Sequence, residues 1–306
     1  MLQSESGLST RVSGVELSGK NQNRMGARAA TLCKRNPAHK FCYGHALVVS
    51  GGAGCTGAAR LAARGALRVG AGLVTLGVPA SAQLEVASQI TALMLAEVDG
   101  ARQLEFVLND DRINALCLGP ALGLSRALAL VPVALASGRP CVLDADALTA
   151  YVNAPQQLFE QVHSACVLTP HGGEFSKLFP DLASDYAGGS AGGRLYAKAD
   201  AARDAAARSG CVVLLKGAET VIAAPDGRIL TQEAFGEDAA PWLATAGSGD
   251  VLAGFITGLM ARGLPAFEAA EMGAWLHAAC ARSFGPGLIA EDLPEELPKV
   301  LKDLGC

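Results

Sequence analysis

The feature that most constrains this chain is a series of short apolar segments without polar alternation, separated by alanine-rich stretches that have helical spacing. These segments are Ala46–Ser50, Leu73–Gly77, Ala115–Leu118, Pro140–Leu143, Cys166–Thr169 and Val212–Lys216. Strands that are apolar on both faces and joined by helices belong to a mostly parallel sheet with helices on both sides. The sequence therefore predicts an α/β fold with one core and three layers.

The last third of the chain refines this prediction. Val221–Ala224 and Arg228–Thr231 flank a Pro-Asp-Gly turn, which indicates a hairpin near the sheet edge. A long apolar helix is expected over Ser248–Arg262, where Gly254 and Gly258 are four residues apart and permit close helix packing. Ligands of such sheets bind beyond the carboxyl ends of the strands, so the loops after the strands are the ones to search.

Composition and charge exclude several classes of function. The formal net charge is −4 and no run of five like charges occurs, which argues against a nucleic-acid partner. No apolar run is long enough to span a bilayer, and no basic and apolar leader opens the chain. We expect no membrane partner and a cytoplasmic location.

The nine cysteines contain no C-x-x-C pair, so we expect neither a disulfide framework nor a zinc site. Several lie inside apolar segments and are predicted to be core residues. Residues 1–40 are polar and rich in glycine and serine, without a hydrophobic period. They are expected to be a tail or the remnant of a linker, with the folded domain over 41–306.

The strongest motif is Gly247-Ser248-Gly249-Asp250, directly before the apolar helix. The helix-start N–H groups of Ser248, Gly249 and Asp250 would point outward at the positive end of the helix dipole, and Gly247, Ser248 and Gly249 are expected to form an anion hole there. An acid inside an anion site would repel a bound phosphate, but it suits a base that takes a proton from a hydroxyl group. The motif predicts phosphoryl chemistry with Asp250 as the base. The alternative is that Asp250 is only a favourable first-turn acid.

Two further motifs are less specific. Residues 52–57 match G-x-G-x-x-G, but the next strand lacks the terminal acid of a dinucleotide site, the nearest being Glu85. This loop is predicted either to line a ligand or to form only a tight turn. In Lys216–Thr220, a lysine and a hydroxyl around a glycine suit nucleotide phosphates or ribose, and a solvated edge lysine is the alternative.

Polar residues also follow two other strands. His171 stands beside two glycines and is a candidate for hydrogen-bonding a ligand, while Glu174 either caps a helix start or lies near a metal-bound phosphate. Asp144 and Asp146 follow another strand, although helix capping explains Asp146 equally well.

Taken in order, these motifs resemble the ADP/ATP-dependent NAD(P)H-hydrate dehydratases, nicotinamide nucleotide repair enzymes of the ribokinase-like superfamily. The resemblance spans about residues 39–295. It rests on His39-Lys40, Tyr43-Gly44-His45, Thr56–Ala59, Gly70–Val74, Gly119–Gly123, Asp144–Asp146, His171–Glu174, Lys216–Thr220 and Gly247–Asp250. It implies a three-layer ribokinase-like fold.

The resemblance also implies roles for individual residues. The hydrated dinucleotide would contact Ala58, Gly123, His171 and Asp250, with Asp250 as the catalytic base. The adenine nucleotide would be held by Lys216, Gly217, Ala218, Glu219, Thr220 and Gly249. This sequence departs from the family pattern at Ala121, where the family has glycine, and in milder ways at Gly172 and Ala218.

The implied activity is that of a hydro-lyase. ADP or ATP, with Mg²⁺, would phosphorylate the C6 hydroxyl of the S epimer of hydrated NADH or NADPH, and loss of phosphate would regenerate NAD(P)H. The family implies a homo-oligomer and, as a functional partner, an NAD(P)H-hydrate epimerase. Because only a short segment precedes the domain, we expect epimerase activity to be absent from this chain.

Two alternatives stay open. One is a vitamin-precursor or sugar kinase of the same fold, which would stop at a phosphorylated alcohol. The other is a non-catalytic nucleotide-binding regulatory module. The loops at 119–123 and 171–174 favour the dehydratase over the kinase, and Asp250 favours an enzyme over the module.

Overall fold

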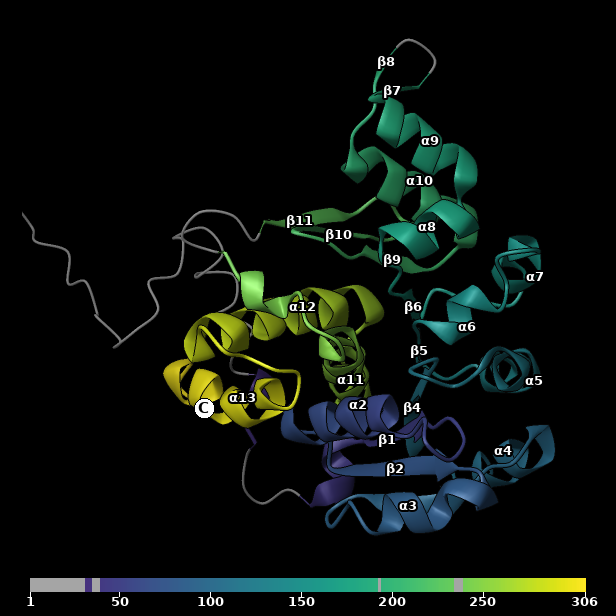
Figure 1. The fold of residues 1–306 in the computed structure, drawn as a ribbon, viewed down its shortest axis with the longest axis vertical. Helices are drawn as coiled ribbons and strands as arrows, with labels where there is room; N and C mark the ends of the chain where they lie inside the picture. Colours follow the sequence, from purple (N-terminus) through teal and green to yellow (C-terminus); the bar gives the residue numbers. More distant parts are fainter. Residues whose placement is uncertain (1–30, 35–38, 192–193, 234–238) are drawn as a thin grey trace, which may run out of the picture.

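The computed structural model describes residues 31–34, 39–191, 194–233 and 239–306, and its centre is one nine-stranded sheet (Figure 1). The strand order is β11-β10-β9-β6-β5-β4-β1-β2-β3. Every neighbouring pair from β9 to β3 is parallel, and β10 runs antiparallel to both β9 and β11. The predicted parallel sheet and edge hairpin are confirmed.

The strands of this sheet are β1 (His45–Val49), β2 (Leu73–Val78), β3 (Met94–Glu97), β4 (Ile113–Leu118), β5 (Cys141–Leu143), β6 (Cys166–Leu168), β9 (Val212–Leu215), β10 (Glu219–Ala223) and β11 (Ile229–Glu233). A separate hairpin pairs β7 (Ser190–Ala191) with β8 (Arg194–Leu195). The longer helices are α2 (Gly57–Arg68), α5 (Leu124–Ala136), α9 (Pro180–Gly188), α10 (Lys198–Ser209), α11 (Ser248–Ala261), α12 (Ala266–Phe284) and α13 (Asp292–Asp303). The shorter ones are α3 (Gln83–Ala87), α4 (Ala101–Val107), α6 (Asp146–Thr149), α7 (Pro155–Phe159) and α8 (Gly172–Leu178).

Helices cover both faces of the sheet, as expected for three layers. One core lies between the sheet and the group α2, α11, α12 and α13, and it receives alternate β1 residues such as Ala46 and Val48. The other core receives Leu47 and Val49 and lies under α4, α5, α6, α8 and α10. Figure 1 shows the two helix groups on opposite sides of the strands. Successive residues of these strands point alternately into the two cores, and the strands therefore have no polar face.

Close packing of α11 on α2 depends on two glycines. A Cβ atom at Gly254 would lie 2.1 Å from the carbonyl oxygen of Ala62, and one at Gly258 would lie 2.5 Å from that of Ala66. Any larger residue would push the helices apart, so the predicted purpose of this glycine pair is confirmed. The contact matters for the site, because α11 begins at the Gly247–Asp250 motif.

The strand β3 was not predicted. Its four residues are all at least partly exposed, and it pairs only with β2, at the edge of the sheet. Such an edge strand has no need of the continuous apolar run that marks the central strands. Helix α10 begins at Lys198, after β8, in which residues 194 and 195 pair with β7.

Part of the segment expected to be a tail is packed on the domain. Leu32 is buried, and the Arg262 guanidinium donates hydrogen bonds to the carbonyl oxygens of Thr31 and Leu32, both at 2.7 Å. Cys33 forms a disulfide with Cys306 at the other end of the chain. Contact with the domain thus begins before residue 40. The sequence predicted no disulfide framework, and this single disulfide was not predicted.

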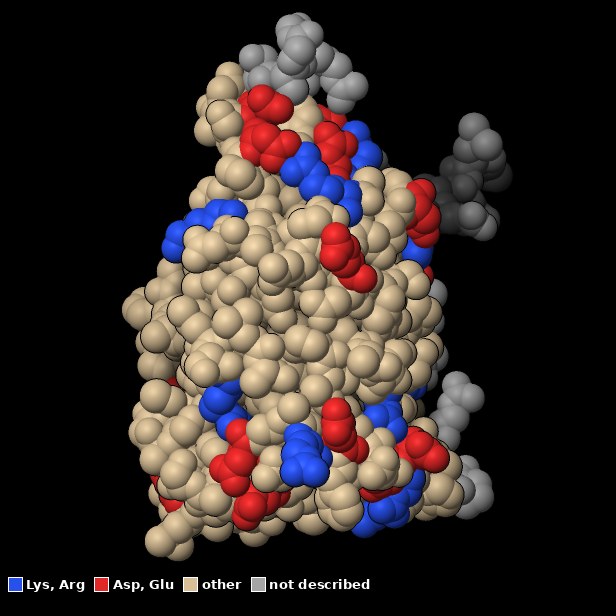
Figure 2. Space-filling view, turned by 90° about the vertical axis from the view of Figure 1, so that its right-hand side faces the viewer, with Lys and Arg blue, Asp and Glu red and all other residues tan. Residues whose placement is uncertain are grey.

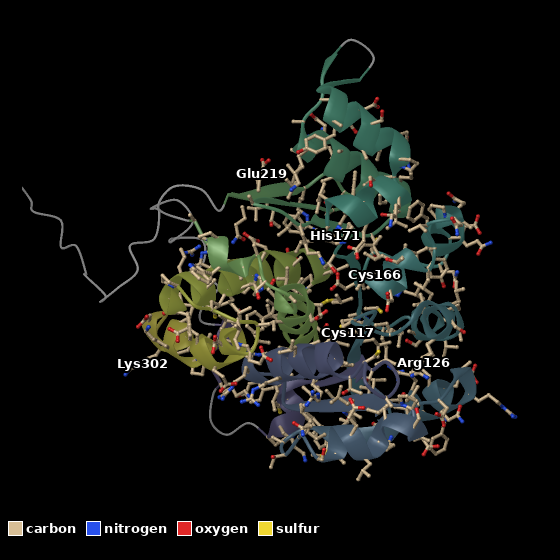
Figure 3. All side chains as sticks on the ribbon, viewed as in Figure 1. Cys117, Arg126, Cys166, His171, Glu219 and Lys302 are labelled. Carbon is tan, nitrogen blue, oxygen red and sulfur yellow. A yellow bond between two sulfur atoms is a disulfide. The ribbon has the colours of Figure 1, made fainter. Side chains whose placement is uncertain are left out.

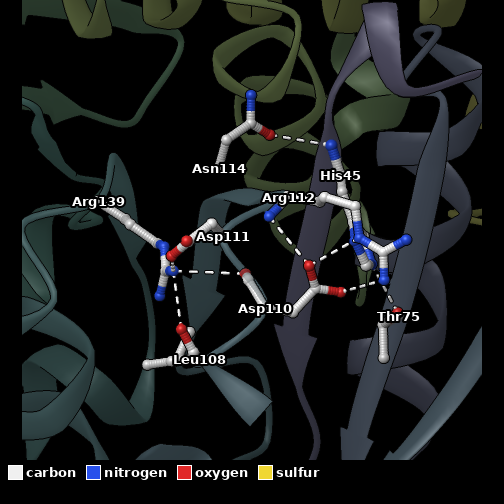
Figure 4. A network of polar contacts seen from close by, with 8 residues as sticks. All are labelled: His45, Thr75, Leu108, Asp110, Asp111, Arg112, Asn114 and Arg139. Atoms are coloured by element: carbon white, nitrogen blue, oxygen red, sulfur yellow. Dashed lines mark hydrogen bonds and ion pairs between the residues drawn. The ribbon is translucent and has the colours of Figure 1, made fainter.

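A polar network at the amino ends of the strands is structural (Figure 4). Asn114 accepts from the His45 N–H at 2.9 Å and donates to the Ala261 carbonyl at 2.7 Å, so it joins β1 and β4 to the end of α11. The buried His45 ring lies 2.8 Å from the Thr75 hydroxyl, and burial lowers the pKa of this histidine. His45 therefore stabilises the end of the sheet opposite to the ligand edge.

Charged side chains on the face that α5 and α7 help to form gather at its two ends, with both signs interspersed (Figure 2). The exposed residues of α5 include the apolar Leu124 and Leu128. This face therefore carries no field of a single sign of the kind that binds nucleic acid. Among the described residues, no helix is both long and apolar enough to cross a membrane.

Candidate functional site

The start of α11 has the geometry of an anion site. Gly247 has a φ of 85°, a left-handed conformation that favours glycine, and it turns the chain into the helix. The N–H groups of Gly249 and Asp250 meet no backbone acceptor among the described residues, whereas that of Ser248 lies 3.5 Å from the Thr245 carbonyl. Two first-turn donors are thus open to a ligand, and the third is weakly engaged.

A buried histidine supports this turn from behind. His277 Nε2 lies 2.8 Å from the carbonyl oxygen of Ser248, so this nitrogen carries the hydrogen and donates it. Burial lowers the pKa of His277 to about 4, although the bond to Ser248 opposes that effect. The Ser248 hydroxyl donates to the Leu243 carbonyl at 2.7 Å. The first turn of α11 is therefore fixed on both sides before any ligand arrives.

A buried ion pair lies beside the turn. Lys216 Nζ is 2.7 Å from Asp144 Oδ1, and the Thr169 hydroxyl donates to the same oxygen at 2.8 Å. The residue Asp144 is only 2% exposed. Burial alone would lower the pKa of Lys216, but the charge and hydrogen bond of Asp144 outweigh it and raise that pKa. The ammonium group lies 3.4 Å from where a Cβ of Gly249 would stand, so it faces the anion site.

The electrostatics of this cluster suit a base. Burial, and after it the charge of Asp144, raise the pKa of Asp250 from 3.8 to about 6, although Lys216 partly offsets both effects. A carboxyl with this pKa is ionised at neutral pH and is a much stronger proton acceptor than an ordinary aspartate. The predicted residues Asp250, Gly249 and Lys216 are therefore brought together, and Asp144 joins them.

His171 and Glu174 form a capping box at the start of α8. His171 Nδ1 accepts from the N–H of Gly173 at 2.9 Å, and Glu174 Oε2 accepts from the His171 N–H at 2.9 Å. The opposite side of the imidazole is exposed, so Nε2 is available to a ligand, with Glu174 Oε1 3.5 Å away. The Pro170 carbonyl accepts from the Lys216 N–H at 2.9 Å, which ties this loop to the nucleotide segment. Of the two roles expected for Glu174, capping is the one that the structure shows.

The loop before α5 is held by Asp146. Its carboxylate accepts from the N–H of Gly123 at 2.8 Å, so capping of α5 occupies this acid. Ala121 and Ala145 have φ values of 48° and 47°, which alanine rarely adopts, and such strain is concentrated at functional loops. Gly123 itself is exposed at this edge of the sheet, as a ligand contact requires.

The glycine loop at 52–57 is already occupied by a carboxylate. Glu85 accepts from the Gly54 N–H at 2.7 Å and from the Thr56 hydroxyl. Donors that would hold a pyrophosphate in a dinucleotide fold are thus used within the chain, which agrees with the missing acid in the sequence. Ala58, in the first turn of α2, is half-buried behind this loop.

The turn between β9 and β10 carries the predicted nucleotide segment. Gly217 and Ala218 are exposed, and the Thr220 hydroxyl donates to the Gly217 carbonyl at 3.0 Å. Figure 3 shows Glu219 and His171 in the same half of the molecule, whereas Arg126 lies in the other half beside α4. Contacts of Ala58, Gly123, His171 and residues 217–220 with ligands stay predictions.

Three polar residues near these loops were not predicted from the sequence. His277 and Lys198 lie in helices without any motif. Arg126, in the first turn of α5, donates to the carbonyls of Val98 at 2.9 Å and Asp99 at 2.8 Å. No local pattern marks such residues, because their partners are backbone carbonyls that are distant in the sequence.

The sequence is similar to proteins of one family. The family model for NAD(P)H-hydrate dehydratase matches residues 46–302. A bifunctional NAD(P)H-hydrate repair enzyme of Moorella thermoacetica is 40% identical over 281 residues, covering 87% of this chain and 51% of the relative. The chain thus spans about half the length of the bifunctional relatives. An ADP-dependent (S)-NAD(P)H-hydrate dehydratase of Neisseria meningitidis is 34% identical, covering 87% of each chain.

Solved structures agree as well. The ADP/ATP-dependent NAD(P)H-hydrate dehydratase of Bacillus subtilis, co-crystallised with ATP and Mg²⁺, superposes with a TM-score of 0.75 at 29% identity, covering 90% of this chain and 95% of that one. Ribokinase of Arabidopsis thaliana superposes with a TM-score of 0.55 at 13% identity, over 85% of this chain and 99% of that one, which confirms the ribokinase-like fold alone. By the match of the family model and the identity to full-length relatives, this chain belongs to the NAD(P)H-hydrate dehydratase family.

Proposed function

We propose that this chain catalyses the dehydration of the S epimer of hydrated NADH and NADPH, with ADP or ATP as the phosphoryl donor. The observation that carries the proposal is the Asp250 carboxyl, with a pKa of about 6, beside two open N–H groups and the Lys216 ammonium. Full-length relatives with this activity support it.

Each residue of this cluster has its own role in the phosphoryl transfer. Asp250 accepts the proton of the C6 hydroxyl, and the hydroxyl oxygen forms a bond to the terminal phosphorus of the nucleotide as the bridging P–O bond breaks. The N–H groups of Gly249 and Asp250 and the Lys216 ammonium stabilise the charge on the transferring phosphoryl group. AMP leaves when ADP is the donor, and ADP leaves when ATP is.

Elimination completes the reaction. The lone pair of the ring nitrogen expels the C6 oxygen as phosphate, a far better leaving group than hydroxide. Loss of a proton from C5 then restores the C5–C6 double bond of the dihydropyridine. A kinase of the same fold would stop one step earlier, at the phosphate ester.

The residues of this site fit a Mg²⁺ ion that is bound mainly through the phosphates of the nucleotide. The described residues contain no group of three or more His, Cys, Asp or Glu side chains that could hold a metal ion. Asp144 is engaged by Lys216 and Thr169, and Glu174 is engaged in the capping box of α8. Mg²⁺ usually binds through substrate phosphates with few protein carboxylates. When bound, it would spread the charge of the phosphates.

The remaining expectations belong to the same proposal. Lys216, Gly217, Ala218, Glu219, Thr220 and Gly249 would hold the adenine nucleotide. Ala58, Gly123, His171 and Asp250 would contact the hydrate. Because the proposed substrate is the S epimer, an NAD(P)H-hydrate epimerase would be needed to convert the R epimer into it. A cytoplasmic location and a homo-oligomeric state stay predictions, and the mass of the protein in solution tests the latter.

Product analysis tests the proposed function. The protein is incubated with hydrated NADH, ADP and Mg²⁺, and NADH, AMP and phosphate are measured together. The proposal requires one of each per turnover, all lost in Asp250→Asn. A phosphorylated hydrate that accumulates without NADH would identify a kinase, and ADP binding without any product would identify a regulatory module.

A further inference from the structure

A lysine outside every motif lies directly under the nucleotide segment. Lys198 is the first residue of α10, and its Nζ donates to the carbonyl oxygens of Lys216, at 3.2 Å, and of Glu219. A Cβ at Gly217 would stand only 2.7 Å from this nitrogen. The ammonium group therefore occupies the space inside the turn between β9 and β10 that the missing side chain of Gly217 leaves open.

This location is unfavourable for a lysine, so it needs a compensating contact. The positive end of the α10 dipole repels a cation at its first residue. Burial also lowers the pKa of Lys198, although the nearby charge of Glu219 opposes that effect. Among the described residues, the two carbonyl oxygens of the turn and the charge of Glu219 offset these costs. Lys198 therefore stabilises the turn, and the start of α10 gains nothing from its charge.

The consequence is a turn whose acceptors face inward. Carbonyl oxygens 216 and 219 bind Lys198, and carbonyl oxygen 217 binds the Thr220 hydroxyl. Carbonyl lone pairs that faced an anionic nucleotide would repel it, so their engagement inside the turn removes that repulsion. It also fixes the backbone on which Lys216 projects toward the anion site.

We propose that Lys198 is a positioning residue for the adenine nucleotide, which it serves by holding turn 216–220 in its binding conformation without transferring any group itself. This inference rests on the proposed function, since it takes that turn as the nucleotide segment. It separates nucleotide binding from hydrate binding, because in the described part of the chain the Lys198 ammonium bonds to this turn and to none of the loops at 52–58, 119–123 or 171–174.

The test replaces Lys198 with methionine, which keeps the length of the side chain and removes the charge and the donors. Arg203→Met is the matched control, since Arg203 lies on the same helix and, within the described ranges, pairs with Asp200 at 3.0 Å and not with the turn. Calorimetric titration with ADP is combined with the KM for ADP, the KM for the hydrate, kcat and the melting temperature.

For Lys198→Met we expect the Kd and KM for ADP to rise roughly tenfold, the usual effect of losing a hydrogen bond to a charged group. The KM for the hydrate and kcat should stay within about twofold, and Arg203→Met should leave all values unchanged. Lys198→Gln, which keeps a donor without the charge, should fall between methionine and the wild type.

Two results would overturn the inference. One is an unchanged ADP affinity in Lys198→Met, and the other is an equal loss in both KM values and kcat together with a large fall in melting temperature. Failure of the proposed function looks different, because the wild-type protein would then bind no ADP or would form no NADH from the hydrate.

Discussion

Asparagine at position 250 should make this protein more stable while it removes most of the turnover. The carboxyl of Asp250 is largely buried at the start of α11, and burial together with Asp144 raises its pKa from 3.8 to about 6. Each pKa unit corresponds to about 1.4 kcal/mol, so ionising this group in the folded protein costs about 2–3 kcal/mol once solvent screening is allowed for. An amide of the same size avoids this cost.

The sign of the effect follows from linkage. The pKa of Asp250 is higher in the folded state than in the unfolded chain, so the folded state of the wild type has its full stability below pH 3.8 and loses stability as the pH rises through about 6. The stability gain of Asp250→Asn should therefore be near zero at acidic pH and reach about 2–3 kcal/mol at neutral pH. For a chain of this size that gain corresponds to a rise in melting temperature of about 3–5 °C.

The assay measures denaturant unfolding and kcat on the same variant at pH 5 and pH 8. We expect kcat to fall by about 10²–10⁴-fold, the range for losing a positioned general base. If Asp250 were only a first-turn acid that stabilises the helix dipole, the variant would lose stability and keep its turnover. That pair of results would refute the reasoning.

Four further predictions follow from the same cluster and from the chain ends. The wild-type kcat should fall as the pH drops below about 6, because protonated Asp250 cannot act as a base. Lys216→Met should raise the KM for ADP and move the acidic limb of the kcat profile to higher pH, whereas Asp144→Asn should move this limb to lower pH. If the two limbs did not move apart, Lys216 and Asp144 would not be the residues that set the pKa of Asp250. Lys216→Met should also lower the free energy of unfolding by about 3–5 kcal/mol, because the buried Asp144 carboxylate loses its cationic partner. The double variant Lys216→Met with Asp144→Asn should recover part of that loss. Thiol titration of the unfolded, unreduced protein should find the seven free cysteines, since Cys33 and Cys306 are paired, and nine free thiols would exclude the disulfide.

The central sheet and the helix motif could be predicted because each signal is local. Apolar runs define buried strands wherever both faces are covered, and a glycine turn before an apolar helix defines an anion site at any place in the chain. The same reasoning missed β3, whose residues are partly exposed at the sheet edge. It also missed the packing of Leu32, because one apolar residue in a polar segment has no period to detect.

The support of the site could not be predicted, because its contacts join residues distant in sequence. Asp144 was noticed, but its ion pair with Lys216 spans 72 residues of sequence. His277 reaches the Ser248 carbonyl across 29 residues, and within the sequence it is one polar residue in an apolar helix. Sequence patterns thus indicated the groups that we propose to face the ligands, whereas the groups that fix their positions and pKa values required the structure.

The path of one oxygen atom tests the central claim most directly. Hydrated NADH is prepared in ¹⁸O-labelled water, so that the C6 hydroxyl carries the label, and is then incubated with the protein, ADP and Mg²⁺ in ordinary water. Phosphorylation of that hydroxyl followed by elimination predicts that each phosphate released carries one ¹⁸O atom. Unlabelled phosphate, with NADH formed at the same rate, would show that the hydroxyl leaves as water and that Asp250 does not serve phosphoryl transfer.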